Sequence, residues 1–399
     1  MKKIKVLLFQ PYLRQHILNF GRGLKNVDFD WQPTKKVRYS YKTLPEFEKE
    51  INRVKKNKIN ILRQILGIPN IRLKYSSSHD LLFTYGCMLF SNKPFVTYIE
   101  TGLAPFNYNH VIARHPLAQL LFLASALTTN CKKIVFMSEA AQKSFFSTLN
   151  YRNSLRQKLE QKCTVVYPLV PTKASLSKNF PSQKMKILFA GVFYMKGGLE
   201  LVHAFQKLEE AHPDQAELTL VTAIRMIRPT DVELIRNIKN INLVDAVLTE
   251  EEMSNLYAEN HIFCLPTFRE GFGLVLVEAL AHGMPIITTD QFATTEMAIA
   301  GYNSFVYPDH PLKDYQPKTF AMLGKYYHPR DFYRDLFMLQ NTGELLLVED
   351  FIYTSLETYL KSKSLFENHS RNSIKLFQEK FSSDVISKKI EGVFIEAAR

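Results

Sequence analysis

Short apolar segments alternate with amphipathic segments along most of this chain. Each apolar segment is hydrophobic on both faces and ends at polar or turn residues, which is typical of strands buried in a parallel sheet. A first series comprises Lys5–Phe9, Leu81–Thr84, Phe95–Ile99, Lys133–Met137 and Thr164–Tyr167, and a second comprises Lys186–Ala190, Glu217–Val221, Ile241–Leu243, Ile262–Leu265 and Pro285–Thr288. Helical periodicity appears between them, for example in Leu199–Glu210, Glu250–Glu259 and Gly273–Ala281. The alternation predicts an α/β protein whose parallel sheets carry helices on both faces.

The two series predict two similar domains. A chain of 399 residues is too long for one hydrophobic core. Residues 171–184 are polar and lack periodicity, which is a linker signature. We therefore expect a first domain over residues 1–172, a linker over 173–184 and a second domain over 185–374, with a C-terminal helix over 375–399 completing the first domain. Ligands in such sheets bind beyond the carboxyl ends of the strands, so a shared site should lie in the cleft between the domains.

The overall charge favours anionic partners without choosing among them. The formal net charge is +13, which suits nucleotides, phosphorylated lipids, an acidic membrane face or nucleic acid. An evenly solvated basic surface is the alternative. No recognised nucleic-acid-binding motif accompanies the charge, so we expect no nucleic-acid partner.

Cysteine usage and apolar run lengths indicate a cytoplasmic protein. The four cysteines are scattered, with no pair at metal-ligand spacing, which fits a reducing compartment. The apolar start stops at Gln10-Pro11, shorter than an export signal needs. No apolar run approaches the roughly 20 residues of a membrane span.

A basic segment over residues 51–75 suggests contact with a membrane surface. It carries seven lysines and arginines, and no acidic residue lies between Glu50 and Asp80. Its apolar residues recur at helical spacing, and a basic amphipathic helix of this kind can lie on an anionic bilayer. Packing of the helix on the first domain, with a solvated basic face, is the alternative. A membrane contact would place the protein at the inner face of the membrane.

A glycine turn between a strand and a helix suggests a phosphate site. The strand that ends at Gly191 is followed by Lys196 and then by a helix from Leu199. Free N–H groups at a helix N-terminus favour an anion, and Lys196 adds a full positive charge. The alternative is that Lys196 is an ordinary solvated surface lysine.

A second turn carries two glutamates eight residues apart. Gly271 and Gly273 let the backbone approach a ligand, and Glu270 lies between the strand and the helix. Glu278 lies within an apolar helix, where a charge needs a hydrogen-bonded partner or ligand. A ribose diol would satisfy it. A structural pairing with an arginine or a backbone N–H is the alternative.

The pattern Arg269-Glu270-Gly271-Phe272-Gly273, continued by Glu278-Ala279 and by Gly283 and Pro285, resembles the E-x7-E motif of retaining glycosyltransferases of family 4. The resemblance implies the GT-B fold, two Rossmann-like domains with parallel sheets that face each other across a cleft. It implies that Glu278 holds the donor ribose. Glu270, with Gly271, Phe272 and Gly273, would contact the sugar and its phosphate, and Lys196, beside Gly191, would neutralise the leaving diphosphate.

Two departures from the family pattern affect the site. Val192 replaces an arginine that often follows the phosphate-loop glycine, and Arg225, Arg228 or Arg269 could compensate. Glu100 stands where many members have a histidine that faces the reacting sugar. A carboxylate there could orient a sugar hydroxyl or the acceptor, so Glu100 joins Glu270 and Lys196 as a catalytic candidate.

The expected activity is transfer of a hexose-type sugar from a nucleoside-diphosphate sugar to a glycan or lipid-linked acceptor. UDP is the favoured nucleotide, with GDP as the alternative, and retention of configuration follows from the resemblance alone. Lysine and helix N–H groups can stabilise a departing diphosphate, and no aspartate cluster suggests a divalent ion, so we expect no metal and no cofactor. The alternatives are a nucleotide-sugar-binding scaffold subunit without turnover and a GT-B sugar-nucleotide epimerase.

Overall fold

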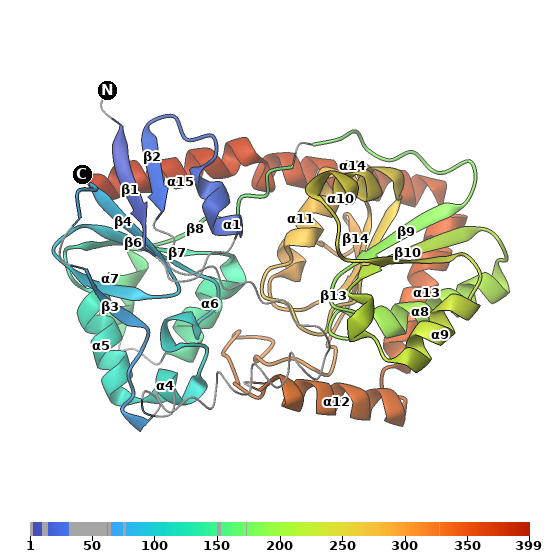
Figure 1. Cartoon of the computed structure of the whole chain (residues 1–399), viewed down its shortest axis with the longest axis horizontal. Coiled ribbons are helices and arrows are strands. Elements are labelled where there is room, and N and C mark those ends of the chain that lie inside the picture. The colour runs from blue at the N-terminus through green and yellow to red at the C-terminus, as the bar shows by residue number, and fades with distance from the viewer. Residues whose placement is uncertain are drawn as a thin grey trace.

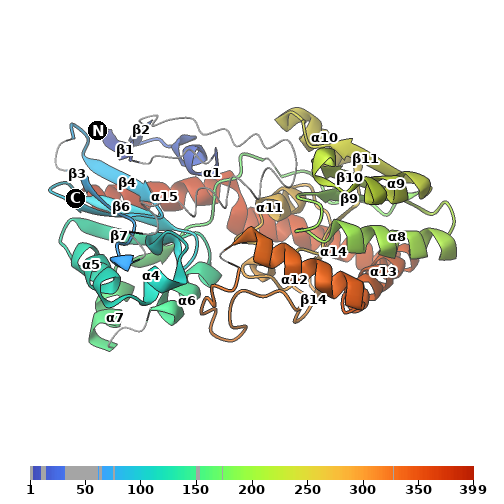
Figure 2. The same ribbon diagram turned by 60° about the horizontal axis from the view of Figure 1, so that its bottom comes forward.

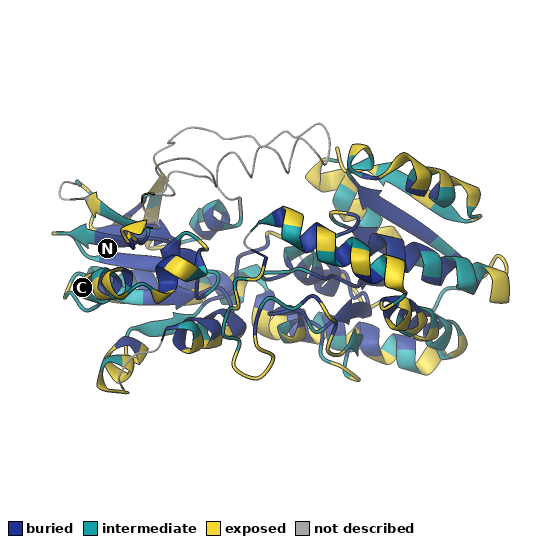
Figure 3. Cartoon of the chain, turned by 90° about the horizontal axis from the view of Figure 1, so that it is seen from below, coloured by how far each residue is buried: buried dark blue, intermediate teal, exposed yellow. Residues whose placement is uncertain are grey.

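The protein folds into two α/β domains that lie side by side (Figure 1). Its computed structural model describes residues 3–9, 15–31, 62, 65–74, 77–149, 153–172, 174–326 and 328–399. Figure 3 shows the strands largely buried, whereas the surface helices have one buried and one exposed face. The predicted strands are confirmed to within two residues at either end.

The first domain is built on a six-stranded parallel sheet with the order β2-β1-β4-β6-β7-β8. These strands are β1 (Ile4–Leu8), β2 (Val27–Trp31), β4 (Leu81–Tyr85), β6 (Phe95–Ile99), β7 (Cys131–Phe136) and β8 (Cys163–Val165). Two short strands, β3 (Ile71–Lys74) and β5 (Met88–Ser91), pair separately. The helices are α1 (Gln15–Leu18), α4 (His110–Arg114), α5 (Pro116–Ala126), α6 (Glu139–Thr148) and α7 (Asn153–Glu160). Every residue of β4 and β6 is buried, as their continuous apolar sequences require.

The second domain repeats this design with the strand order β11-β10-β9-β12-β13-β14. These strands are β9 (Met185–Ala190), β10 (Ala216–Thr222), β11 (Ile241–Asp245), β12 (Ile262–Leu265), β13 (Ile286–Thr289) and β14 (Ser304–Tyr307). Its helices are α8 (Gly198–Ala211), α9 (Pro229–Asn237), α10 (Glu250–Glu259), α11 (Leu274–Ala281), α12 (Pro329–Thr342), α13 (Leu346–Lys361) and α14 (Lys363–Leu376). The central strands β9 and β12 end at the cleft, so the loops that follow them supply the site.

The chain crosses between the domains at two adjacent places. The first crossing is the linker, whose described residues 171, 172 and 174–184 form neither helix nor strand. The second is a π-helical turn, Phe377–Phe381, between α14 and α15 (Ser383–Ala398). The Ser383 hydroxyl donates to the Val170 carbonyl at 3.2 Å, so the two crossings touch. Beyond the turn, α15 packs against the first sheet (Figures 1 and 2), where Phe394 contacts Phe29 and Phe83.

A partly buried carboxylate joins the domains at the cleft. Glu296 of the second domain accepts from the backbone N–H groups of Glu139, at 3.0 Å, and Ala140, at 2.9 Å. These N–H groups lie in the first turn of α6 of the first domain. Glu296 therefore satisfies N–H groups that an isolated helix end would leave unpaired. Burial raises the pKa of Glu296, while the two backbone bonds lower it.

Candidate functional site

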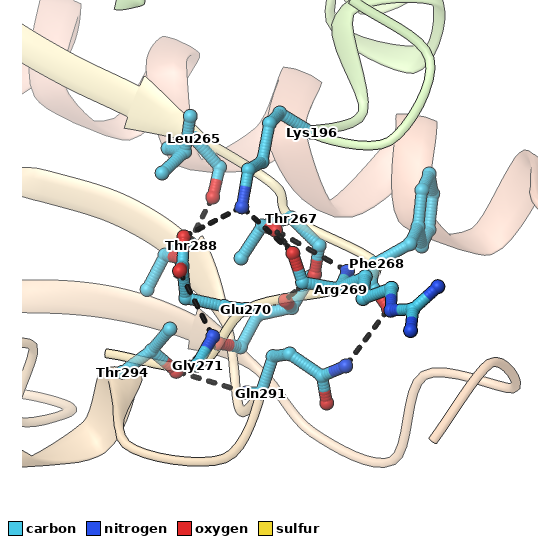
Figure 4. Close-up of polar contacts among 11 residues, drawn as sticks. Lys196, Leu265, Thr267, Phe268, Arg269, Glu270, Gly271, Thr288, Gln291 and Thr294 are labelled. Carbon is cyan, nitrogen blue, oxygen red and sulfur yellow. Dashed lines mark hydrogen bonds and ion pairs between the residues drawn. The ribbon is translucent and has the colours of Figure 1, made fainter. Parts of the chain in front are cut away.

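Lys196 and Glu270 form an ion pair at the mouth of the cleft. The Lys196 Nζ donates to Glu270 Oε2 at 2.6 Å and to the Arg269 carbonyl at 2.7 Å (Figure 4). Both side chains are mostly buried, with 16% and 15% exposed, so Lys196 is not a solvated surface lysine. Gly191 makes room for it, because a Cβ at 191 would lie 2.8 Å from Lys196 Cγ. The glycine turn after β9 therefore aims Lys196 at the turn after β12.

Threonines at the end of β13 hold the Glu270 turn in place. Thr288 Oγ1 donates to the Leu265 carbonyl at 2.7 Å (Figure 4), and Thr289 Oγ1 donates to the Thr267 carbonyl. The Gly271 N–H donates to Glu270 Oε1 at 2.9 Å, so both oxygens of this carboxylate are engaged. The Glu270 carboxylate is thereby fixed before any ligand arrives.

A cavity of about 270 Å³ lies between the domains beside this pair. Glu270, Gly271 and Arg269 line it from the second domain, and Glu100 lines it from the first. Glu100 follows β6 directly, and its Oε1 accepts from the Tyr108 hydroxyl at 2.5 Å. The cavity is completed by Gln291, Asp314 and Tyr326, among others, which the sequence reasoning missed. The structure thus brings Glu100 and Glu270 into one cavity.

Glu278 lies in α11 and does not line this cavity. Its Oε2 accepts from the Tyr257 hydroxyl at 2.8 Å, and burial raises its pKa. A tyrosine hydroxyl is therefore its protein partner, rather than an arginine or a backbone N–H.

Phe272 and Gly273 shape the start of α11. The Phe272 side chain is buried against Tyr167 and Phe381, next to the chain crossings, so donor contact from Phe272 could come only from its backbone. Gly273 precedes α11 with φ of 98°, a left-handed conformation that favours glycine.

Two of the three arginines expected to compensate for Val192 are engaged elsewhere. The Arg269 guanidinium donates to the Tyr326 carbonyl at 3.1 Å and is turned away from Lys196 (Figure 4). Arg228 bonds Asp231 and lies over the ring of Tyr194. Arg269 therefore belongs to the wall of the cavity and not to the phosphate loop.

The described residues hold no group of three or more histidine, cysteine or acidic side chains that could bind a metal ion. Among the helices they form, none is long and apolar enough to cross a membrane.

Residues 184–321 match the family described as glycosyl transferases group 1. The match covers most of the second domain. Over 104 residues the chain is 34% identical to the MMP α-(1→4)-mannosyltransferase of Mycolicibacterium hassiacum, covering 26% of this chain and 25% of that protein. It is 29% identical to the lipopolysaccharide core biosynthesis mannosyltransferase LpsB of Rhizobium meliloti, covering 30% of this chain and 35% of the relative. These matches therefore span between a quarter and about a third of the relatives' own length.

Solved structures resemble the whole chain in fold. A glycosyltransferase from Rickettsia africae superposes with a TM-score of 0.55 at 13% identity and covers 100% of both chains. The Anabaena protein HepE, solved in complex with UDP and glucose, gives a TM-score of 0.53 at 12% identity over 98% of both chains. The chain has the GT-B fold, as expected, with two parallel sheets on either side of a cleft.

Proposed function

We propose that the protein is a retaining glycosyltransferase of family 4 that moves a hexose-type sugar from a nucleoside-diphosphate sugar, without a metal ion. The observation that carries this proposal is the Lys196–Glu270 pair, which lies at the carboxyl ends of β9 and β12 near the N-terminus of α8. A diphosphate would compete with Glu270 for Lys196 and would lie near the positive end of the α8 dipole. Release from Lys196 would leave Glu270 Oε2 free to accept a hydrogen bond from a sugar hydroxyl. The same lysine would then neutralise the departing diphosphate.

The remaining roles follow the E-x7-E resemblance, with UDP favoured and GDP as the alternative. Glu278, positioned by Tyr257, would hold the donor ribose. The backbone of Gly271, Phe272 and Gly273 would contact the sugar and its phosphate. Glu100, held by its neighbour Tyr108, would orient a sugar hydroxyl or the acceptor from across the cleft.

We also propose a glycan or lipid-linked acceptor and a cytoplasmic location at the inner face of a membrane. Most of the basic segment 51–75 lies outside the described residues. Its described part exposes Leu62, Ile65 and Leu66. Gly67 packs against the ring of His115 at the start of α5, where Val111, Leu117 and Leu120 are also exposed. Apolar side chains beside basic ones suit the surface of an anionic bilayer. Cosedimentation with vesicles that contain anionic lipid tests the contact, and equal recovery with neutral vesicles would contradict it.

A thermal-shift screen of UDP, GDP, ADP and their sugars tests the donor class. A ligand that binds only the folded state at 100 times its Kd adds about 2.7 kcal/mol to the free energy of unfolding. We expect one nucleotide series to stabilise the protein and Lys196→Met to abolish that shift. Lys207→Met is the matched control, because Lys207 lies on α8 but pairs with Asp350. Failure of all three series would refute the proposal.

Turnover separates an enzyme from a binding subunit. We expect the wild type to hydrolyse or transfer its donor, and Glu270→Gln to bind the nucleotide but lose this activity. A wild type that binds nucleotide sugars without any turnover would instead be a scaffold subunit. Conversion of the donor into an isomeric nucleotide sugar would identify an epimerase.

A further inference from the structure

Residues 309–326, called the strap below, link β14 to α12 and reach across to the first domain (Figure 1). The Met322 N–H donates to Thr148 Oγ1 in α6 at 3.1 Å. Gly324 packs on His110 of α4, since a Cβ at 324 would lie 2.3 Å from the His110 ring. The strap therefore contacts the first domain at two places and supplies part of the cavity wall.

The strap is fixed on the second domain by Tyr315. Its hydroxyl accepts from the Phe292 N–H at 2.8 Å and donates to the Asp290 carbonyl at 2.9 Å. Its ring stacks on Phe320, with ring centroids 5.5 Å apart. Phe292 has φ of 51°, a left-handed conformation that costs a phenylalanine about 1 kcal/mol or more. Strain of this kind is retained where the surrounding structure fixes it, as Tyr315 does here.

Asp314 and Arg269 lie on the strap side of the cavity. Asp314 accepts from the backbone N–H groups of Lys325, at 2.6 Å, and Tyr326, at 3.4 Å. Arg269 is held by the Tyr326 carbonyl and by the ring of Phe332. Burial raises the pKa of Asp314, and the nearby guanidinium of Arg269 opposes that rise. A carboxylate and a guanidinium are thus held side by side in the cavity wall by the backbone of the strap.

Gln291 brings to the cavity wall a side-chain oxygen that accepts no hydrogen bond. The side chain is buried, and its Nε2 donates to the Phe268 carbonyl at 2.8 Å, which fixes the orientation of the amide. Its Oε1 is buried with no hydrogen-bond partner, although Gln291 lines the cavity. Such an atom costs about 1–3 kcal/mol unless a ligand supplies the missing donor.

We propose that Asp314 and Gln291 select the transferred sugar, by accepting hydrogen bonds from the hydroxyls of a neutral monosaccharide and excluding sugars that carry a carboxylate. The inference rests on the proposed function. The cavity is lined by the carboxylates of Glu100, Glu270 and Asp314 and by one guanidinium, that of Arg269. Lys196 pairs with Glu270, so one negative charge is in excess around the cavity. A uronate would add a further negative charge at close range. A cavity of about 270 Å³ lies at the small end of ligand pockets, which suits one sugar ring.

Calorimetric titrations with UDP, UDP-glucose and UDP-glucuronate test whether the site selects a neutral sugar. If only GDP binds, the corresponding GDP sugars are used instead. We expect the wild type to prefer the neutral sugar to the uronate by about tenfold or more, because repulsion between like charges of about 1.4 kcal/mol already gives a factor of ten. Asp314→Asn should reduce that preference to below about threefold while the Kd of UDP stays unchanged. Lys318→Ala, on an exposed part of the strap, is the matched control and should behave as wild type.

An unchanged sugar preference in Asp314→Asn would overturn the inference. Equal loss of UDP and UDP-glucose affinity would overturn it too, because it would indicate that Asp314 only holds the strap. If Asp314→Asn does not fold, Gln291→Met provides a second test and should weaken the binding of UDP-glucose but not of UDP, and unchanged binding of UDP-glucose would overturn the inference. Failure of the wild type to bind any nucleotide would count against the proposed function itself.

Discussion

Glu200 should make the protein less stable as the pH rises, and the size of the effect follows from its burial. Glu200 lies in the first turn of α8 and is 1% exposed. Its Oε1 accepts from Gln340 Nε2 at 2.7 Å, while Oε2 is buried with no partner. Burial raises the pKa of this carboxyl from 4.5 to about 7. The folded protein therefore keeps a proton that the unfolded chain releases.

The sign of the effect follows from proton counting. Between pH 4.5 and about 7 the unfolded state binds fewer protons at this site, so the free energy of unfolding falls as the pH rises. At roughly 1.4 kcal/mol per pH unit, the contribution of Glu200 falls by about 3 kcal/mol across this range. The full contribution is present below pH 4.5 and has been lost above about pH 7.

Glu200→Gln isolates this contribution, because glutamine keeps an acceptor for Gln340 and cannot ionise. Urea unfolding of wild type and variant, followed by circular dichroism at pH 4.5 and pH 8, measures the difference between them. We expect the variant to gain about 3 kcal/mol relative to wild type on going from pH 4.5 to pH 8. Glu210→Gln, at an exposed position of the same helix, is the control and should show no such gain. Parallel pH profiles for wild type and Glu200→Gln would refute the reasoning.

Two further substitutions probe the phosphate loop and the domain contact. Gly191→Ala should displace Lys196, because the new Cβ would lie 2.8 Å from Lys196 Cγ. A calorimetric titration should then show nucleotide binding weakened about tenfold or more. Unchanged affinity would show that Lys196 does not bind the diphosphate. Glu296→Ala should weaken the contact between the second domain and α6, since each hydrogen bond to an ionised carboxylate contributes about 1.5–3 kcal/mol. The radius of gyration measured by X-ray scattering should therefore increase. An unchanged radius would mean that other contacts hold the domains together.

The parts of the fold that sequence reasoning could predict are those with a local signal. β4 and β6 are buried on both faces, so their sequences are apolar throughout. The sequence analysis missed β2, because Val27–Trp31 alternates apolar residues with two aspartates and has no continuous apolar run. Such alternation is typical of a half-exposed strand, and β2 lies at the edge of the sheet. Local pattern thus reveals central strands more readily than edge strands.

Some residues of the candidate site also have a local sequence signal, whereas others are placed only by long-range contacts. Lys196 and Glu270 follow buried strands and have glycines beside them, so their proximity could be expected from parallel-sheet geometry. The direction of Arg269 depends on the Tyr326 carbonyl, which lies 57 residues away in the sequence. Asp314 lies in an irregular segment with no motif, and its place in the cavity depends on how the strap crosses the cleft. Such long-range contacts leave no periodic trace in a single sequence.

The hydrogen bond between Ser383 and Val170 has a mechanical consequence. It places the two covalent crossings next to each other, which is the arrangement that a hinge between two domains requires. The crossings lie along one edge of the molecule, and the strap lies toward the opposite edge (Figure 1). In a lever of this form, displacement grows with distance from the pivot. A small rotation at such a hinge would move the strap furthest, so the wall proposed to select the sugar would also be the part of the cleft that opens widest.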